Sequence, residues 1–344
     1  MTIKRVGFCC KWIDRPDQVD GIKPADDCKK YNTGGTTVAW LNRQKRDVAE
    51  QKLWDLMEQN IESIRKLVKR VGTLDDNLRM VRISSDILPV YTESTWGYFW
   101  LRPDVRNYCE RHFSAVGDIA RDSGVRLSMH PGQFTVLASD NADIVDRSIA
   151  EFEYHVDMAR WMGYGKTFQD FKINVHIAGR QGPAGIRQAL ARMTPEARNT
   201  LTIENDEMTW GIEDSLELVD DCALVLDIHH HNIKTGEYID ANSDTVKNII
   251  DSWRGVRPVI HYSMSREDIL VGHCDRTPPD LHNLLESGHK KGKLRAHSDF
   301  MWNHALNEWA YTHWEWADVM VEAKGKNLAS FKLHEFWKSL ENPV

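Results

Sequence analysis

The sequence has no long apolar run, few cysteines and no excess of basic residues. No stretch approaches the roughly 18 apolar residues that a membrane-spanning helix needs, and the opening MTIKRVGFCC lacks the pattern of a signal peptide. We therefore expect a cytoplasmic protein with no membrane partner. The six cysteines show no CxxC spacing and two of them are adjacent, which fits neither a simple disulfide framework nor a zinc knuckle. We interpret them as reduced thiols, most of which pack in the interior.

The net charge of −7 is unfavourable for a DNA-binding protein, because a basic face is the usual electrostatic footprint on phosphate. Basic residues nevertheless cluster in two segments, RKLVKR at 65–70 and KKGKLR at 290–295. Each cluster taken alone is more simply a solvated face of a helix or loop. Bound divalent cations would neutralise acidic groups and reverse the local field, so the charge does not exclude DNA.

Short apolar runs alternate with longer amphipathic stretches, which is typical of a parallel sheet wrapped by helices. Eight runs are predicted strands: 5–9, 80–84, 125–130, 172–176, 200–204, 223–228, 258–262 and 318–322. Seven helices are expected between and after them: 47–70, 105–123, 142–161, 185–198, 212–221, 243–253 and 327–340. An eighth, 279–287, and a tryptophan-rich stretch that favours a helix packed on the barrel lie in the long connection after the seventh strand.

A chain of 344 residues with eight such strands suits one barrel. The prediction is an α/β protein with a single (β/α)8 TIM barrel as its one domain, residues 1–344. Long loops are expected at 14–37 and 263–316, and the second of these is an insertion after the seventh strand.

Six of the predicted strands end in side chains that bind metals. The residues at or just after these ends are His130, His176, Glu204, Asp227, His230, His261 and Glu322. In a (β/α)8 barrel, side chains from the carboxyl ends of the strands converge on one pocket. Imidazole and carboxylate without thiolate suit zinc, manganese or iron(II). The set is larger than one ion with open positions can use, so it predicts two or three ions.

Paired divalent ions supply a hydroxide nucleophile near neutral pH and stabilise both the entering and the leaving oxygen of an in-line displacement. Phosphodiester hydrolysis fits that chemistry. Aldose–ketose isomerisation on the same scaffold fits it as well, so the metal-ligand set alone does not choose the substrate.

Five segments carry a resemblance to a known family: MVRISSDILP, LSMHPGQF, LVLDIHHH, AHSDF and VMVEAKGK. They resemble the UV-damage endonucleases, which are more distantly similar to endonuclease IV and the xylose-isomerase-like barrels. The resemblance implies a monomeric DNA repair enzyme that binds damaged double-stranded DNA and uses no nucleotide cofactor. It would recognise UV photoproducts, with other helix-distorting lesions or abasic sites as alternatives, and hydrolyse the phosphodiester 5′ to the damage. It would be associated with the nucleoid when acting on DNA.

The resemblance also implies the site. It places metal ligands at His130, His176, Glu204, Asp227, His230, His261, His297 and Glu322. His297 would fold back over the pocket from the long seventh connection. Two or three divalent ions are implied, with Mn²⁺ the first choice and Zn²⁺ the alternative. Glu204, Asp227 and Glu322 are the candidate catalytic carboxylates, and their roles in clamping ions or orienting water stay open.

The sequence departs from the family pattern at two positions near the metals. Glu93 stands where the family usually has a further histidine ligand, and we expect its carboxylate to bind metal in that place. Val259 stands where the family often has a lysine, two residues before His261. Any role of that amine is therefore expected to be absent.

The expected lesion-contacting residues are Gln133, Phe134, Phe8 and Trp12. Gln133 and Phe134 match a glutamine and an aromatic residue that enter the duplex at a lesion in the family, where an amide and a flat ring fill the gap left by displaced bases. Phe8 and Trp12 match a tyrosine and an asparagine of the family, so this part of the surface has lost two polar groups.

Two alternatives stay open. A sugar isomerase or epimerase on the same barrel would explain the acidic charge, but it predicts fewer ligands and a catalytic lysine near them. A damaged-DNA-binding protein that no longer cleaves would need little of the ion cluster that the strand ends predict. Metal content together with cleavage of damaged DNA separates the three hypotheses.

Overall fold

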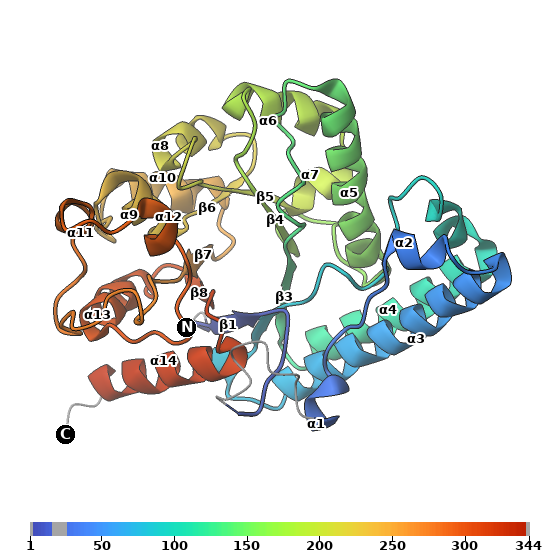
Figure 1. Ribbon diagram of the computed structural model, residues 1–344, viewed down its shortest axis with the longest axis horizontal. Helices are drawn as coiled ribbons and strands as arrows, with labels where there is room; N and C mark the ends of the chain where they lie inside the picture. The colour runs from blue at the N-terminus through green and yellow to red at the C-terminus, as the bar shows by residue number, and fades with distance from the viewer. Residues whose placement is uncertain (1–2, 16–25, 342–344) are drawn as a thin grey trace.

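The computed structural model describes residues 3–15 and 26–341. Eight parallel strands form one sheet in the order β6-β5-β4-β3-β2-β1-β8-β7, which curls into a barrel (Figure 1). The strands are β1 (Val6–Cys9), β2 (Met80–Arg82), β3 (Arg126–Met129), β4 (Lys172–His176), β5 (Leu201–Glu204), β6 (Ala223–Val225), β7 (Val259–Tyr262) and β8 (Asp318–Val321). All eight predicted strands are present, so the prediction of a (β/α)8 barrel is confirmed.

The barrel is closed between β6 and β7 by a bridge just beyond the end of β6. Asp227 pairs with His261 across this seam, and the His261 backbone N–H donates to the Leu226 carbonyl at 3.0 Å. The closure therefore brings two predicted metal ligands side by side. Most strand residues are buried on both faces of the sheet, as expected where helices cover the outside and side chains fill the inside.

Helices surround the sheet. In chain order they are α1 (Asp26–Lys29), α2 (Val38–Leu41), α3 (Arg46–Val71), α4 (Pro103–Asp122), α5 (Ala142–Trp161), α6 (Gly182–Arg192), α7 (Pro195–Thr200), α8 (Ile212–Ser215), α9 (Ile228–Thr235), α10 (Asp244–Ser252), α11 (Leu281–Glu286), α12 (Lys291–Leu294), α13 (His304–His313) and α14 (Lys326–Glu341). Short 3₁₀ turns lie at 76–78, 97–101 and 216–218. In Figure 1, α3 and α4 lie side by side on one side of the barrel, and α9 to α13 lie on the other.

One helix prediction and one strand prediction differ from the structure. The helix expected over 185–198 is interrupted between α6 and α7, because Pro195 cannot continue a helix and disfavours helical geometry in the residue before it. Thr194 accordingly caps α7 with its hydroxyl. The predicted sixth strand, 223–228, ends three residues early at Val225, and Asp227 caps α9 instead.

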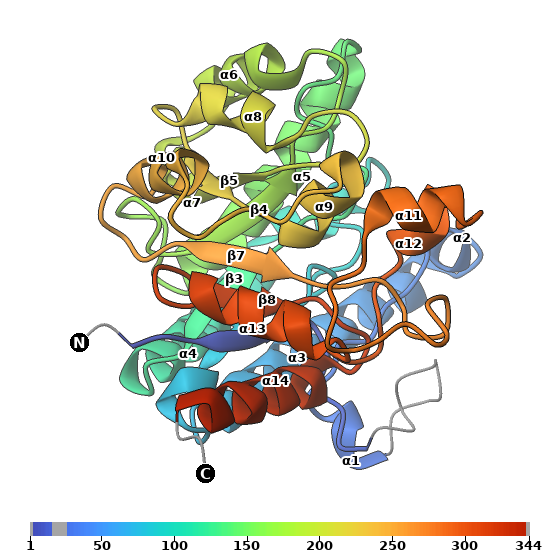
Figure 2. The same cartoon turned by 90° about the vertical axis from the view of Figure 1, so that its left-hand side faces the viewer.

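The connection between β7 and β8 is partly helical, since it contains α11, α12 and α13. Figure 2 shows the arrowhead of β7 pointing toward α9, α11 and α12, so the insertion lies over the carboxyl ends of the strands. Part of the other predicted long loop, 14–37, lies outside the described residues, and its described part contains α1. Among the described helices, none has the length and apolar character needed to cross a membrane.

The opposite end of the barrel is held by a buried carboxylate. Asp318, at the start of β8, accepts from Arg126 at 2.7 Å, from Arg257 at 2.8 Å and from the backbone N–H of Arg5 at 2.8 Å. These partners lie in or just before β3, β7 and β1. One carboxylate therefore ties β1, β3, β7 and β8 together at the end of the barrel opposite the predicted ligands.

Candidate metal centre

The predicted ligands converge at the carboxyl ends of the strands. His130 follows β3, His176 ends β4, Glu204 ends β5, His261 lies in β7 and Glu322 follows β8. The remaining ligands come from the two connections at the barrel mouth. Asp227 and His230 belong to the first turn of α9, where the Asp227 carboxylate accepts from the backbone N–H groups of His229 and His230 at 2.8 Å each. Capping this helix fixes the direction of the Asp227 side chain.

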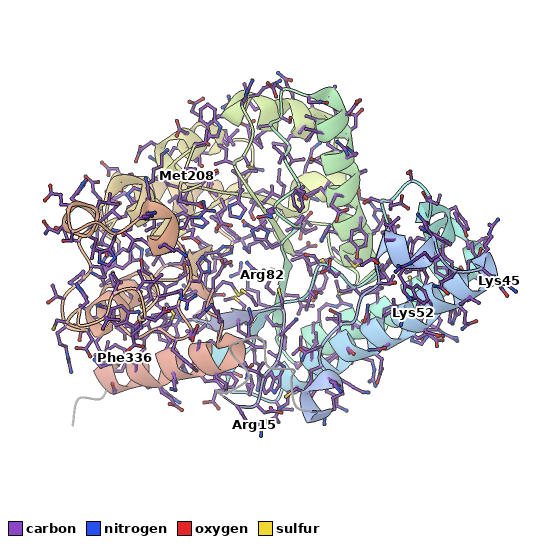
Figure 3. The ribbon with its side chains drawn as sticks, in the orientation of Figure 1. Arg15, Lys45, Lys52, Arg82, Met208 and Phe336 are labelled. Atoms are coloured by element: carbon purple, nitrogen blue, oxygen red, sulfur yellow. The ribbon has the colours of Figure 1, made fainter. Side chains whose placement is uncertain are left out.

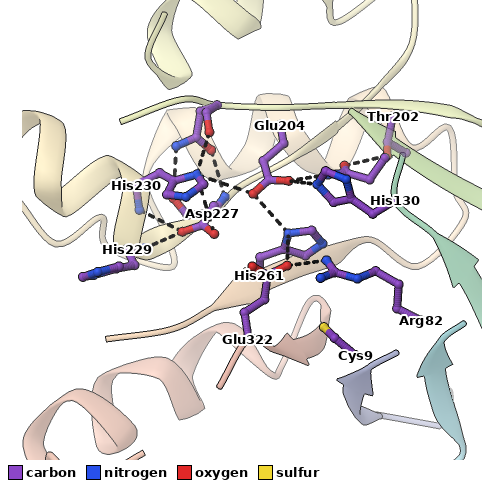
Figure 4. A network of polar contacts seen from close by, with 12 residues as sticks. Cys9, Arg82, His130, Thr202, Glu204, Asp227, His229, His230, His261 and Glu322 are labelled. Atoms are coloured by element: carbon purple, nitrogen blue, oxygen red, sulfur yellow. Dashed lines mark hydrogen bonds and ion pairs between the residues drawn. The ribbon is translucent and has the colours of Figure 1, made fainter. Parts of the chain in front are cut away.

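Glu204 lies at the centre of the network (Figure 4). Its carboxylate oxygens are 3.4 Å from His130 Nε2, 3.1 Å from His261 Nδ1 and 3.5 Å from His230 Nδ1. His261 Nδ1 is also 3.2 Å from Glu322. The contacts join side chains from β5, β7, β8, the end of β3 and α9 around one buried carboxylate.

Two groups of side chains have the geometry to hold a metal ion. In each group one ligand atom per residue lies within 4.8 Å of the others: His130, His176 and Glu204 form one group, and Glu204, Asp227 and His261 form the second. Glu204 belongs to both. A carboxylate has two oxygens, so it can bind one ion with each. The arrangement therefore suits two neighbouring ions bridged by Glu204.

The hydrogen bonding of these buried groups also fits metal ions. Glu204 Oε1, Asp227 Oδ2 and His261 Nδ1 are buried and make no hydrogen bond, although Glu204 Oε1 and His261 Nδ1 form an ion pair at 3.1 Å. Buried polar atoms are nearly always paired, and leaving them unpaired is costly. All three belong to the second group of ligands, and a divalent cation between them would satisfy them together. The donor set of imidazole and carboxylate suits manganese or zinc.

The pKa values show how the metal-free site distributes its charge. Burial alone would raise the pKa of Glu204, but the nearby His261 and His176 outweigh it and hold that pKa well below its usual range. Burial raises the pKa of Asp227 well above its usual range, against the opposing effect of His230. Burial lowers the pKa of His261 to about 4. The pKa values of the two carboxylates are therefore shifted in opposite directions, and bound cations would favour the charged form of both.

Arg82 belongs to the network at the barrel mouth, and the sequence did not single it out. It ends β2 and forms an ion pair with Glu322 at the barrel mouth, and Figure 3 labels it near the centre of the molecule. Burial alone would raise the pKa of Glu322, but Arg82 is the main group that holds it well below its usual range. Arg82 therefore keeps Glu322 charged beside His261.

Lys172 is a second residue that was missed. It begins β4, is buried inside the barrel, and its Nζ lies 2.9 Å from His261 Nε2. Val259 is buried on β7 and carries no amine, but the Lys172 amine lies beside His261 from a different strand. The signal in the sequence is alternation: Lys172, Asn174 and His176 share one face of β4 because successive side chains of a strand point to opposite faces.

Glu207 and Arg295 extend the network toward the surface. Glu207 lies in the loop after β5, 3.7 Å from His230 Nε2, and Arg295 donates to its other oxygen at 2.9 Å. His297, two residues beyond Arg295, lies 3.9 Å from Glu322 and its ring faces those of His229 and His230. The insertion after β7 therefore brings His297 next to Glu322.

Three predicted site residues are not with the others. Phe8 and Trp12 are 0% and 3% exposed and pack edge to face in the core with ring centroids 5.9 Å apart, so their prediction as lesion contacts is wrong. Glu93 belongs to neither ligand group among the described residues. Its carboxylate accepts from the backbone N–H groups of Thr95 and Trp96 at 2.9 Å each, because a short turn follows it. The prediction of Glu93 as a ligand is therefore not supported by its position.

Gln133 and Phe134 stand at the surface in the loop after β3. Phe134 is 85% exposed, and both side chains line a cavity of about 740 Å³ that also reaches His130. Gln133 lines a second cavity of about 210 Å³ with His130 and His176. An exposed aromatic ring and an amide thus lie directly beside the first group of ligands.

These features define a (β/α)8 barrel with a candidate dinuclear metal centre at the carboxyl ends of its strands. A sequence model of the family described as UV-endonuclease UvdE matches residues 25–342, which is most of the chain. The chain therefore belongs to the UvdE family.

Individual relatives agree with this family. A UV-damage endonuclease of Schizosaccharomyces pombe is 28% identical over 298 residues, covering 83% of this chain and 44% of the relative. A UV DNA damage endonuclease of Bacillus velezensis is 23% identical over 311 residues and covers 87% of each chain. The crystal structure of SacUVDE has the same fold, with a TM-score of 0.71 and 20% identity over 98% of this chain and 99% of that one. The chain spans less than half the length of its relatives from S. pombe and Neurospora crassa.

Proposed function

We propose that this chain is a metal-dependent DNA repair endonuclease that hydrolyses a phosphodiester on the 5′ side of a UV photoproduct. The observation that carries the proposal is Glu204, which is shared by two ligand groups at the barrel mouth. Family membership and the relatives named for UV-damage endonuclease activity support the choice of substrate. A Mn²⁺ pair at these groups would supply the nucleophile and stabilise the leaving oxygen.

The protein's own residues have distinct roles in this proposal. Glu204 would hold both ions, and His130 and His176 would complete the first group of ligands. Asp227 and His261 complete the second, where Asp227 is oriented by its cap on α9 and His261 by Lys172. Glu322, kept charged by Arg82, adds a further carboxylate beside His261. A third position near His230 and His297 stays a prediction.

One basic segment of the acidic surface lies where DNA would approach. The cluster at 290–295 surrounds α12 and leads directly to His297, and the buried Leu294 anchors it while Lys290, Lys293 and Arg295 are exposed. Lysines near the metals would contact phosphates and hold the backbone in register. The cluster at 65–70 lies at the end of α3, where Arg65 pairs with Glu62 and Arg70 covers the Trp12 ring. The cluster at 65–70 is therefore a solvated face of a helix, which is the simpler of its two interpretations.

The test is cleavage of end-labelled duplexes in Mn²⁺, one UV-irradiated, one abasic and one undamaged. The proposal expects a discrete nick 5′ to the lesion that is lost in His261→Ala and retained in His112→Ala, a histidine on α4 outside the network. No cleavage of any duplex by protein with a full metal complement would refute it. The predicted monomeric state and nucleoid association stay predictions.

One observation keeps the sugar isomerase alternative testable. That alternative requires a lysine near the metals, and Lys172 is such a lysine. It is buried behind the His261 ring, whereas a catalytic amine must reach its substrate. Interconversion of aldoses and ketoses in Mn²⁺, together with no nicking of damaged DNA, would favour the isomerase. Damage-specific binding without nicking would favour the non-cleaving binder.

A further inference from the structure

The loop after β5 presents an exposed apolar side chain beside the metal centre. Met208 is 60% exposed, and it is labelled in Figure 3. A single exposed apolar residue is normal and needs no explanation by itself. The position of Met208 is the informative feature, because it lines the cavity of about 210 Å³ that His130, His176, Gln133 and Arg295 also line.

The backbone around Met208 is held in a closed turn. The Asp206 carboxylate accepts from the backbone N–H of Met208 and, at 2.8 Å, from that of Thr209. The Asp206 backbone N–H donates to the Trp210 carbonyl at 2.8 Å, which closes the loop at its base. An aspartate that binds backbone N–H groups two and three residues ahead is a standard way to fix a tight turn.

Contacts to neighbouring elements anchor this turn on the barrel. The Trp210 indole donates to the Gly179 carbonyl at 2.7 Å, and Lys234 on α9 donates to the Thr209 carbonyl at 2.9 Å. The Trp210 ring fills the space next to Gly182, where a Cβ would come within 2.6 Å of it. Met208 therefore projects from a preorganised loop, so a contact made by its side chain would cost little loop entropy.

Across the same cavity lies the loop after β3, with Gln133 in the wall and the exposed Phe134 next to it. Met208, the Gln133 amide and Arg295 line this cavity, and Phe134 lines the neighbouring cavity of about 740 Å³, which shares His130 and Gln133 with it. A ligand with a flat apolar face, a hydrogen-bonding edge and a negative charge matches these groups. A nucleotide whose base has left the stack is such a ligand.

We propose that Met208 packs against a nucleobase exposed at the lesion, as a second apolar contact that faces the loop bearing Gln133 and Phe134. The inference rests on the proposed function, and it assigns the loop after β5 to lesion recognition. A thioether on an unbranched side chain adapts to flat surfaces and makes favourable contacts with aromatic rings. Such a contact tolerates any base, because every base has a π-face.

The test compares Met208→Ala with Met208→Leu and with the matched control Val48→Ala, an exposed apolar residue on α3. Affinity is measured by fluorescence anisotropy of Mn²⁺-loaded protein on a duplex with one photoproduct, whose 5′ linkage is a methylphosphonate. We expect Met208→Ala to bind this duplex about tenfold more weakly, as for one lost stacking contact. Affinity for the undamaged duplex should change less than about twofold, and Met208→Leu and Val48→Ala should bind like the unaltered protein.

Cleavage of the all-phosphate duplex supplies an independent measurement. KM should rise about tenfold in Met208→Ala while kcat stays within about twofold, because Met208 binds no metal. Unchanged affinity in Met208→Ala, or equal losses on damaged and undamaged duplexes, would overturn the inference. If the unaltered protein neither binds the lesion duplex more tightly than the undamaged duplex nor cuts it, the proposed function is wrong. The inference about Met208 is then wrong as well. The two failures are distinguished by the unaltered protein alone.

Discussion

Lys172 Nζ lies 2.9 Å from Nε2 of His261, while the other ring nitrogen, Nδ1, lies 3.1 Å from Glu204. Both residues are buried, so no water competes for this contact. Burial lowers the pKa of Lys172 to about 7. The amine fixes the orientation of the imidazole and directs Nδ1 at the second ligand group. Groups that hold a ligand in this way tune metal binding nearly as strongly as the ligands do.

Lys172→Met is therefore expected to weaken Mn²⁺ binding about tenfold, because the His261 ring loses the partner that orients it. Isothermal titration calorimetry of the metal-free protein measures the change. Val259→Ala is the control, since Val259 is buried at the start of β7 and belongs to neither ligand group. An affinity for Mn²⁺ that is the same in Lys172→Met and the unaltered protein would show that the contact does not act on the metal centre.

The shared position of Glu204 predicts unequal metal losses in two variants. Glu204→Gln removes a ligand from both groups, whereas Asp227→Asn removes one from the second group only. We expect Glu204→Gln to retain less than one Mn²⁺ per chain and Asp227→Asn to retain about one. Mass spectrometry of metals after dialysis measures the content. Equal content in the two variants would contradict a bridging role of Glu204.

Glu93→Ala should affect folding and not metal content. Glu93 accepts two backbone N–H groups at 2.9 Å, and losing a side chain that caps a turn typically costs about 1 kcal/mol. Urea unfolding should show this loss, while the Mn²⁺ content stays that of the unaltered protein. A lower Mn²⁺ content in Glu93→Ala would restore the family-based prediction of Glu93 as a ligand.

The sequence predicted the strands and the ligands at their ends because both follow from local patterns. An apolar run of four or five residues predicts a buried strand, and barrel closure then makes residues such as His176 and Glu204 neighbours. Lys172 was missed because a lysine that begins a strand is usually solvated, although its alternation with His176 along β4 places both side chains on the same face. Phe8 and Trp12 were misassigned because alignment with a family carries over positions but not burial. Trp12 packs against Phe331 of α14, more than 300 residues away, and Phe8 packs against Trp12.

Asp318→Asn is expected to destabilise the protein by about 3–5 kcal/mol, because it removes the buried charge that three arginines share. The free energy of unfolding in guanidinium chloride measures the loss. Asp75→Asn is the control, since Asp75 forms an exposed ion pair with Lys338, and such pairs contribute at most about 1 kcal/mol. A loss of stability in Asp318→Asn as small as that in the control would show that the ion pairs of Asp318 are not required for stability.

His155 gives the protein a predicted sensitivity to acid. It lies fully buried in α5, with Nδ1 2.7 Å from the Glu151 carbonyl. Burial lowers its pKa from the ordinary 6.5 to about 4. Below pH 6.5 the unfolded chain therefore binds a proton that the folded protein does not. The stability contributed by the neutral ring is complete above pH 6.5, falls as the pH decreases, and is gone below about pH 4. The full effect is about 3 kcal/mol.

His155→Leu should remove this dependence, because leucine fills the site without a titratable group and leaves the helical backbone hydrogen bonds intact. The free energy of unfolding is measured in urea at pH 7 and pH 4.5 with EDTA present, so that metal release does not contribute. Between these values the variant should lose about 2–3 kcal/mol less than the unaltered protein. Met158→Leu, a change at another buried position of α5, should keep the original dependence on pH. If His155→Leu and Met158→Leu lose stability equally between pH 7 and pH 4.5, His155 must take up a proton in the folded protein as well. We do not expect this, because His155 Nε2 is buried without a hydrogen-bond partner that could stabilise the charged ring.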